Sequence, residues 1–158
     1  MKSLLLALAA LGLGLLLCEG LLSLIYPQVY RRPPRVWQFD ADLGWAHVPA
    51  GKGRLVTPEF NVEIRINADG LRDGDYARQK SGNTRRVLVF GDSFAEGWGV
   101  EVEESLSKRL EVCLRDRGSR AAEVINFGVA GYGTDQELLL FEKLGRHYQA
   151  DVVVVLFY

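Results

Sequence analysis

The stretch that decides the fold reads Arg86-Val-Leu-Val-Phe-Gly-Asp-Ser-Phe-Ala-Glu-Gly-Trp-Gly-Val100. It begins with an unbroken apolar run, Val87 to Phe90, which is typical of a strand buried on both faces in a parallel sheet. Gly91 ends this run, and Asp92 and Ser93 follow where the strand would emerge at its carboxyl end. Ligands of open α/β sheets bind in crevices outside such ends. The pattern places the Ser93 hydroxyl at the mouth of a cleft, although Gly, Asp and Ser are also ordinary turn residues.

The sequence downstream predicts, in order, a helix, a strand, a second helix and a third buried strand. Their expected ranges are 103–117, 124–125, 134–146 and 151–158. Strands that alternate with helices in this way form a parallel sheet with right-handed crossovers. The third strand would leave an exposed apolar edge unless further chain covered it. We therefore expect a sheet that is incomplete at its C-terminus, in a truncated or partial gene product.

Two details of these helices are also predicted. Leu106, Leu110 and Cys113 share the apolar stripe of the first helix, so Cys113 is expected to be a small core residue. Thr134 and Glu137 have the spacing of a capping box, which places the start of the second helix there.

The composition bounds the classes of function. The chain has 158 residues, with 19 Lys and Arg against 20 Asp and Glu. No basic stripe indicates a nucleic-acid partner. The two cysteines, Cys18 and Cys113, do not form a disulfide framework, and no Cys/His cluster indicates zinc. We expect one modest domain that uses neither a metal nor a cofactor.

Residues 1–26 are predicted to be a hydrophobic membrane anchor or signal-anchor. The apolar segment is long enough to cross a bilayer core of roughly 30 Å. No run of small residues follows it to make a cleavage site, which favours an uncleaved single-pass anchor. Orientation stays open, because Arg31, Arg32 and Arg35 favour a cytoplasmic C-terminal side whereas Lys2 favours the opposite.

Residues 27–85 are expected to form a linker followed by a small β-rich extension. Prolines 27, 33 and 34 indicate an extended linker. Val62, Ile64 and Ile66 alternate with polar residues, as in a half-exposed strand. His47 falls in this region with no catalytic partner in view, so a surface or packing role is expected for it.

Three motifs together resemble the GDSL/SGNH hydrolase superfamily. They are Gly91-Asp-Ser-Phe94, then Asn126-Phe-Gly-Val-Ala-Gly-Tyr-Gly-Thr-Asp-Gln136, then Asp151-Val-Val-Val-Val-Leu-Phe-Tyr158. The upstream stretch Glu63-Ile-Arg-Ile-Asn-Ala-Asp-Gly-Leu-Arg-Asp73, behind a hydrophobic N-terminus, looks like the extension of membrane-anchored bacterial members. The resemblance implies a flavodoxin-like three-layer α/β/α fold, with residues 86–158 as the N-terminal part of the hydrolase domain.

The resemblance also implies roles for individual residues. Ser93 matches the nucleophile, and the N–H groups of Ser93 and Gly131 match donors of the oxyanion hole. Gly91, Asp92 and Gly128 would shape the supporting turns. Such donors stabilise the charged oxygen of acyl transfer by roughly 3–4 kcal/mol each, and a glycine allows the backbone to approach that oxygen closely.

Two further family blocks are not found in this sequence. The third is an asparagine just after the third strand, and the fourth is Asp-x-x-His; the sequence ends at Tyr158 before either. A serine nucleophile needs an adjacent base. His147 is expected at the amino-terminal side of the sheet, opposite Ser93. The chain as given is therefore expected to be a weak catalyst or none.

Three functions remain open from the sequence. The first is a serine ester hydrolase that transfers an acyl group through Ser93 to water and acts on a small-molecule, lipid or glycan ester. The second is an O-acyltransferase acting on a glycan, and the third is a non-catalytic fragment or binding module. We expect a membrane protein whose catalytic domain lies outside the cytoplasm, anchored by the N-terminal helix, with the orientation of the anchor left open.

Overall fold

The computed structural model describes residues 2–26, 34–118 and 121–157. The chain divides into two compact units, Met1–Arg32 and Pro33–Tyr158. The expected extended linker at residues 27–33, and Tyr158 at the end of the expected third strand, lie outside the described residues.

The first unit contains helix α1 (Lys2–Ile25), which buries none of its side chains. Its 24 residues rise by about 36 Å, which exceeds the roughly 30 Å of a bilayer's hydrocarbon core. The helix is therefore long and apolar enough to cross a membrane. A signal sequence near an N-terminus meets the same criteria of length and composition, so the helix fits either an anchor or a signal sequence.

The second unit is built on a parallel sheet. Its strands are β5 (Arg85–Gly91), β6 (Ala122–Gly128) and β7 (Val152–Val155), in the spatial order β6-β5-β7. Strand β5, which comes first in the chain among these three, is therefore central in the sheet, as in the flavodoxin-like order of doubly wound folds. Helix α3 (Leu106–Asp116) connects β5 to β6, and α4 (Thr134–Lys143) precedes β7. The expected parallel α/β arrangement is confirmed.

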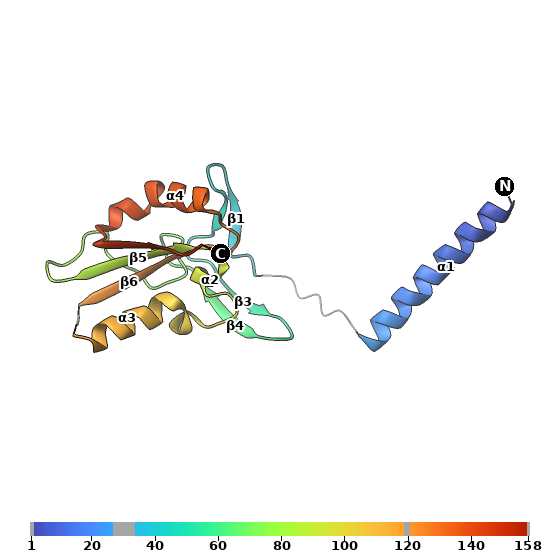
Figure 1. Cartoon of the computed structure of the whole chain (residues 1–158), viewed down its shortest axis with the longest axis horizontal. Helices are drawn as coiled ribbons and strands as arrows, with labels where there is room; N and C mark the ends of the chain where they lie inside the picture. Colours follow the sequence, from blue (N-terminus) through green and yellow to red (C-terminus); the bar gives the residue numbers. More distant parts are fainter. Residues whose placement is uncertain (1, 27–33, 119–120, 158) are drawn as a thin grey trace. The chain divides into compact units, whose positions relative to one another are not determined.

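The sheet lies between helices, with α4 over one face and α3 over the other (Figure 1). Alternate residues of β5 supply both interfaces, because successive side chains of a strand point to opposite faces. Val87 and Val89 share a buried cluster with Leu110 and Leu114 of α3. Leu88 and Phe90 belong to the other cluster, which includes Leu140 of α4. The unbroken apolar run is therefore explained by burial on both faces.

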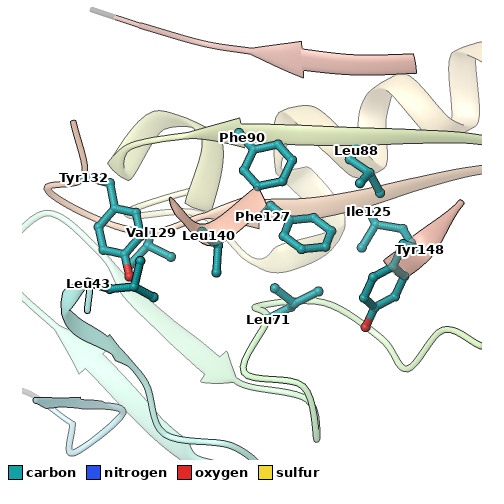
Figure 2. Packing of buried hydrophobic residues seen from close by; sticks show 10 residues of the cluster. All are labelled: Leu43, Leu71, Leu88, Phe90, Ile125, Phe127, Val129, Tyr132, Leu140 and Tyr148. Atoms are coloured by element: carbon teal, nitrogen blue, oxygen red, sulfur yellow. The ribbon is translucent and has the colours of Figure 1, made fainter. Parts of the chain in front are cut away.

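The segment upstream of the sheet contains antiparallel strands and packs on the α/β unit. Strand β1 (Trp37–Asp40) pairs with β2 (Gly44–His47), and β3 (Lys52–Val56) pairs with β4 (Asn61–Arg65). Val62 and Ile64 of β4 are buried, as their alternation predicts. Leu43 and Leu71 join the cluster of Phe127 and Tyr132, as Figure 2 shows.

The prediction that Cys113 is a core residue is wrong, because Cys113 is exposed. Helix α3 follows a short 3-10 helix, η1 (Val102–Glu104), and buries Ser107 and Glu111 instead. The Glu111 carboxylate accepts a hydrogen bond from Val124 N in β6 at 2.8 Å. The helix therefore docks on the sheet partly through polar contacts. Of the predicted stripe, Leu110 packs against the sheet, whereas Leu106 and Cys113 are exposed.

The capping pair of α4 is displaced by one residue from its prediction. Gly133 is the N-cap, and the side chain of Gln136 accepts a hydrogen bond from Gly133 N at 3.1 Å. Glu137 is buried instead. The helix ends at Lys143, before the predicted 146, and a 3-10 helix, η2 (Gly145–Tyr148), follows it.

Strand β7 forms as expected but is not buried. Val152, Val153 and Val155 are 42–46 % exposed. The reason is its position at the edge of the sheet, where it pairs only with β5 among the described strands. The expected exposed apolar edge is therefore present.

Candidate active site

Ser93 is the first residue of a short helix, α2 (Ser93–Glu96), that directly follows β5. The Asp92 side chain accepts a hydrogen bond from Phe94 N at 2.9 Å and so caps this helix. Gly97 ends the helix in the left-handed conformation. Ser93 is partly exposed. The sequence order strand–Gly–Asp–Ser therefore gives a tight turn that carries the hydroxyl at the carboxyl end of the central strand.

The loop that carries Gly131 leaves the neighbouring strand at the same edge. Gly91 lies opposite Gly128 in the parallel pairing of β5 with β6. Val129 N donates to Gly91 O at 3.0 Å, which extends the pairing by one bond. Ser93 follows Gly91 by two residues, and Gly131 follows Gly128 by three. The structure thus brings both predicted loops to one edge of the sheet.

Gly128 allows α2 to rest directly on the end of β6. A Cβ atom at this position would lie 2.2 Å from Glu96 N and 2.5 Å from the carbonyl carbon of Ala95. Both neighbours are backbone atoms, so no side-chain rotation could relieve the overlap. The close approach of these two segments requires a glycine here.

The peptide that joins Ala130 to Gly131 is held on its carbonyl side. The indole Nε1–H of Trp45 donates to Ala130 O at 3.0 Å. This peptide is trans, since the described residues include no cis bond. The Gly131 N–H therefore points away from its own peptide's carbonyl and from the Trp45 nitrogen. Within the described ranges, Gly131 N–H donates to no backbone carbonyl.

The other side of the loop is held by a buried carboxylate. Glu96 is fully buried, and its Oε2 accepts a hydrogen bond from Ala130 N at 2.5 Å. Its Oε1 lies 3.4 Å from Nε2 of His47, and neither side chain is exposed. The loop before Gly131 is thus fixed by α2 on one side and by β2 on the other.

A buried arginine fixes the end of α2. Arg72 is 1 % exposed. Its guanidinium donates to the carbonyl oxygens of Glu96, Gly97, Val100 and Glu63, at 3.2, 2.5, 2.7 and 3.2 Å. Burial lowers the pKa of the Arg72 guanidinium from its ordinary value, while the charge of Glu96 opposes that shift. These bonds tie the turn after Ser93 to β4 and to the segment that follows it.

Asp73 and Asn126 extend this framework to β6. The Asp73 carboxylate accepts from Asn126 N at 2.9 Å and pairs with Lys108 Nζ at 2.8 Å. Burial raises the pKa of Asp73, although Lys108 opposes the shift. The Asn126 side chain donates to Glu96 O at 3.2 Å and accepts from Gly128 N at 2.9 Å. The last residues of β6 are therefore bonded to α2.

Sequence reasoning missed Arg72, Asp73 and Glu96 as parts of this framework. Arg72 and Asp73 lie in a turn-like stretch where charged residues are normally exposed. A usable signal for Glu96 was its place three residues after Ser93, inside an otherwise apolar and Gly-rich turn. His47 is buried, which fits the packing role expected for it. Its contact with Glu96 was not predicted.

Neither histidine presents a ring to Ser93. The His47 ring nitrogens face Gly70 O, at 3.1 Å, and Glu96. His147 is exposed in η2, directly before β7, and so lies at the amino-terminal edge of the sheet as expected. Within the ranges that the structure describes, no group of three or more His, Cys, Asp or Glu side chains could hold a metal ion.

An apolar groove adjoins the turn that carries Ser93. It has a volume of about 400 Å³ and is lined by Asp92, Phe94, Leu106, Leu156 and Phe157. Asp92 and Phe94 flank Ser93 in the sequence, although Ser93 itself does not line the groove.

Comparisons with known proteins give matches among solved structures. No family model matches the sequence, and no curated protein matches it. Among solved structures, the chain is similar to AlinE4, an SGNH-hydrolase family esterase, at 32% identity over 48% of this chain and 41% of that chain, with a TM-score of 0.43. Two substituted forms of the same esterase match at 32% and 33% identity, over 48% and 49% of this chain and 41% and 42% of theirs, with TM-scores of 0.43 and 0.41.

The chain spans about two fifths of the length of these solved structures. TM-scores below 0.5 do not by themselves establish a common fold.

Proposed function

We propose that this chain carries the nucleophile half of an SGNH-type serine ester hydrolase. Ser93 Oγ attacks the carbonyl carbon of an ester, the alcohol leaves, and water then releases the acyl group from Ser93. The N–H groups of Ser93 and Gly131 stabilise the negatively charged oxygen of the tetrahedral intermediate.

The observation that carries this proposal is the pairing of Gly91 with Gly128 at the ends of parallel strands. It starts the two loops from adjacent points of one sheet edge, the position where open α/β sheets bind ligands. The orientation of the Ala130–Gly131 peptide supports the role of Gly131. Trp45 binds the carbonyl oxygen of Ala130, so the Gly131 N–H points away from Trp45. Asp92 caps α2, which supports a structural role for that carboxylate.

The groove lined by Asp92 and Phe94, the sequence neighbours of Ser93, supports an ester whose acyl part is apolar. Phe94, Leu106 and Leu156 supply much of its lining. Burying a methylene group contributes about 0.8 kcal/mol, so each carbon of an acyl chain placed there would strengthen binding. Small-molecule and lipid esters fit this lining best.

The general base for Ser93 is not supplied by either histidine of the 158 residues. His47 is turned toward Glu96 and Gly70, and His147 lies at the opposite edge. Turnover by these 158 residues alone is therefore proposed to be negligible, and the family's Asn and Asp-x-x-His blocks would have to complete the site.

We also assign α1 to a single-pass membrane anchor with the catalytic domain outside the cytoplasm. The length and apolar character of the helix support the anchor. If the chain is anchored, it sediments with membranes at high speed and is released by detergent but not by high salt. Recovery of the intact chain in the soluble fraction without detergent would contradict the anchor.

The test of the enzymatic proposal uses the full product of the gene, including any sequence encoded in frame beyond codon 158. Hydrolysis of p-nitrophenyl butyrate is expected, with a loss of at least about 1000-fold in kcat for Ser93→Ala. Ser81→Ala, in the polar loop before β5, is the matched control and is expected to keep full activity. Equal activity of Ser93→Ala and the unsubstituted protein would contradict the proposal.

A further inference from the structure

The β1–β2 hairpin reaches the candidate oxyanion loop through one face of β2. Trp45 and His47 are two residues apart, so their side chains point to the same face of the strand. Trp45 binds the carbonyl of Ala130 directly. His47 contacts Glu96, and Glu96 in turn binds Ala130 N. Both polar groups of Ala130 are thus held, one by β2 itself and one through a buried carboxylate.

The geometry around His47 fixes the place of one ring proton. Nδ1 lies 3.1 Å from the carbonyl oxygen of Gly70. A carbonyl oxygen only accepts hydrogen bonds, so Nδ1 carries the hydrogen. In a neutral ring, Nε2 would then hold a lone pair and act as an acceptor.

The contact between His47 and Glu96 therefore requires a second proton. Nε2 of a neutral ring and Oε1 of an ionised carboxylate are both acceptors, and at 3.4 Å they would repel each other. Both atoms are buried, and among the described residues neither makes a hydrogen bond, although they lie 3.4 Å apart. One proton between Nε2 and Oε1 removes the conflict, either as an imidazolium–carboxylate pair or as a neutral carboxylic acid bonded to imidazole.

We propose that His47 and Glu96 are positioning residues that share this proton and thereby hold the Ala130–Gly131 backbone in place for acyl transfer. The inference rests on the proposed function, in which Gly131 N–H is an oxyanion donor. Removal of the shared proton leaves two acceptors face to face. The hydrogen bond from Ala130 N to Glu96 then weakens, and the loop that carries Ala130 and Gly131 shifts.

The other charged groups near the pair already have partners. Arg72 faces Glu96 from the segment after β4 and donates to backbone carbonyls. His47 borders a cavity of about 280 Å³ that is also lined by Asp40, Asp69, Arg78 and Lys143. Lys143 pairs with Asp40, and Arg78 pairs with Asp69. The His47–Glu96 contact is therefore the buried polar contact next to Ala130 whose atoms lack partners of their own.

The test is nuclear magnetic resonance on the full 158-residue chain in detergent micelles. Ring nitrogen signals of His47 and amide signals of Ala130 and Gly131 are followed between about pH 5 and pH 9, where histidines commonly titrate. We expect the two amides to shift along with His47, with one common midpoint. Amide signals that stay constant while His47 loses its proton would overturn the proposal.

Two variants sharpen this test. Glu96→Gln places an amide N–H opposite Nε2 and keeps an oxygen for Ala130 N, so the loop signals are expected to become independent of His47 titration. His147→Gln, in the exposed η2, is expected to leave the titration unchanged. A pH-dependent shift of the Ala130 amide that persists in Glu96→Gln contradicts the shared proton, and the titration of the unsubstituted chain decides the matter if that variant fails to fold.

A kinetic readout separates this inference from the proposed function. In the full gene product, Glu96→Ala is expected to lower kcat by roughly 10- to 100-fold, with KM changed less than twofold. Glu96→Gln is expected to restore most of that loss. Full activity of Ser93→Ala would refute the proposed function while leaving the amide titration intact, whereas unchanged kcat in Glu96→Ala refutes the positioning role alone.

Discussion

Trp45 donates its indole N–H to the carbonyl oxygen of Ala130 at 3.0 Å, across 85 positions of sequence. The bond joins the upstream hairpin to the loop of the candidate oxyanion hole. It also sets the direction of the Gly131 N–H, because the two groups belong to one trans peptide. A segment that precedes the α/β unit is therefore a structural part of the candidate site.

Replacing Trp45 by Phe removes this donor while keeping an aromatic ring against Tyr132, whose ring centroid lies 5.7 Å away. We expect kcat of the full gene product to fall about 10-fold, since the Gly131 N–H loses its fixed direction. Ester hydrolysis measures the change. Trp98→Phe is the matched control, because Trp98 packs on Trp37 and Phe60. Equal losses in both variants would mean that the indole bond has no specific role.

Replacing Gly128 by Ala should destabilise the fold, because the new Cβ would overlap the backbone of α2. Overpacking of this kind costs about 1–3 kcal/mol of unfolding free energy. Urea unfolding in detergent, followed by tryptophan fluorescence, measures it. Gly82→Ala is the control, since a Cβ there meets nothing within 4 Å. A Gly128→Ala protein as stable as this control would show that α2 does not rest on β6.

Replacing Arg72 by Met should lower the free energy of unfolding more than replacing any exposed arginine would. Four carbonyl oxygens lose their buried donor, at a cost of about 2–5 kcal/mol in unfolding free energy. Arg65→Met is the control, because the Arg65 side chain is 68% exposed and its loss should change stability by about 0.5 kcal/mol or less. The same unfolding experiment compares the two, and similar losses would contradict the bracing role of Arg72.

The ion pair of Lys143 with Asp40 predicts a dependence of stability on pH. The hydrogen bond from Lys143 holds the pKa of Asp40 below its usual range. A carboxylate with a lowered folded-state pKa stabilises the fold above its unfolded-state pKa, and this contribution disappears as pH falls through the folded-state pKa. The Lys143 side chain is 46% exposed, so the pair contributes about 0.5–1 kcal/mol.

Lys143→Met should therefore lower the free energy of unfolding by about that amount at pH 7. The difference from the unsubstituted chain should vanish in strong acid, where Asp40 is protonated. Lys143→Arg, which keeps the charge, should retain most of the stabilisation. A difference that stays constant from pH 7 into the acid range would exclude Asp40 as its source.

The sheet could be predicted from sequence because its signals are local. The run Val87 to Phe90 is apolar at every position, and the structure buries it on both faces. The strand–helix alternation then limits the topology to a parallel sheet. Predictions from local apolar spacing failed where polar contacts decided burial, as in α3, where Glu111 bonds to β6 and Cys113 faces outward.

The supporting residues of the candidate site could not be predicted, because their contacts join distant segments. His47 lies in β2 and Glu96 in α2. The place of Glu96 in an otherwise apolar turn was the one local signal of its burial, and His47 had none. Charged side chains are rarely fully buried unless they are paired, and pairing is a property of the folded chain. The loops of Ser93 and Gly131 were predictable because each directly follows a strand that the sequence identifies.

The most direct measurement of the central claim is the site of covalent labelling by a fluorophosphonate probe. The full gene product is treated with the probe and digested, and the labelled peptide is identified by mass spectrometry. We predict one adduct, on Ser93, that disappears in Ser93→Ala and persists in Ser81→Ala. An adduct on another serine, or labelling that survives Ser93→Ala, would contradict the assignment of Ser93 as the nucleophile.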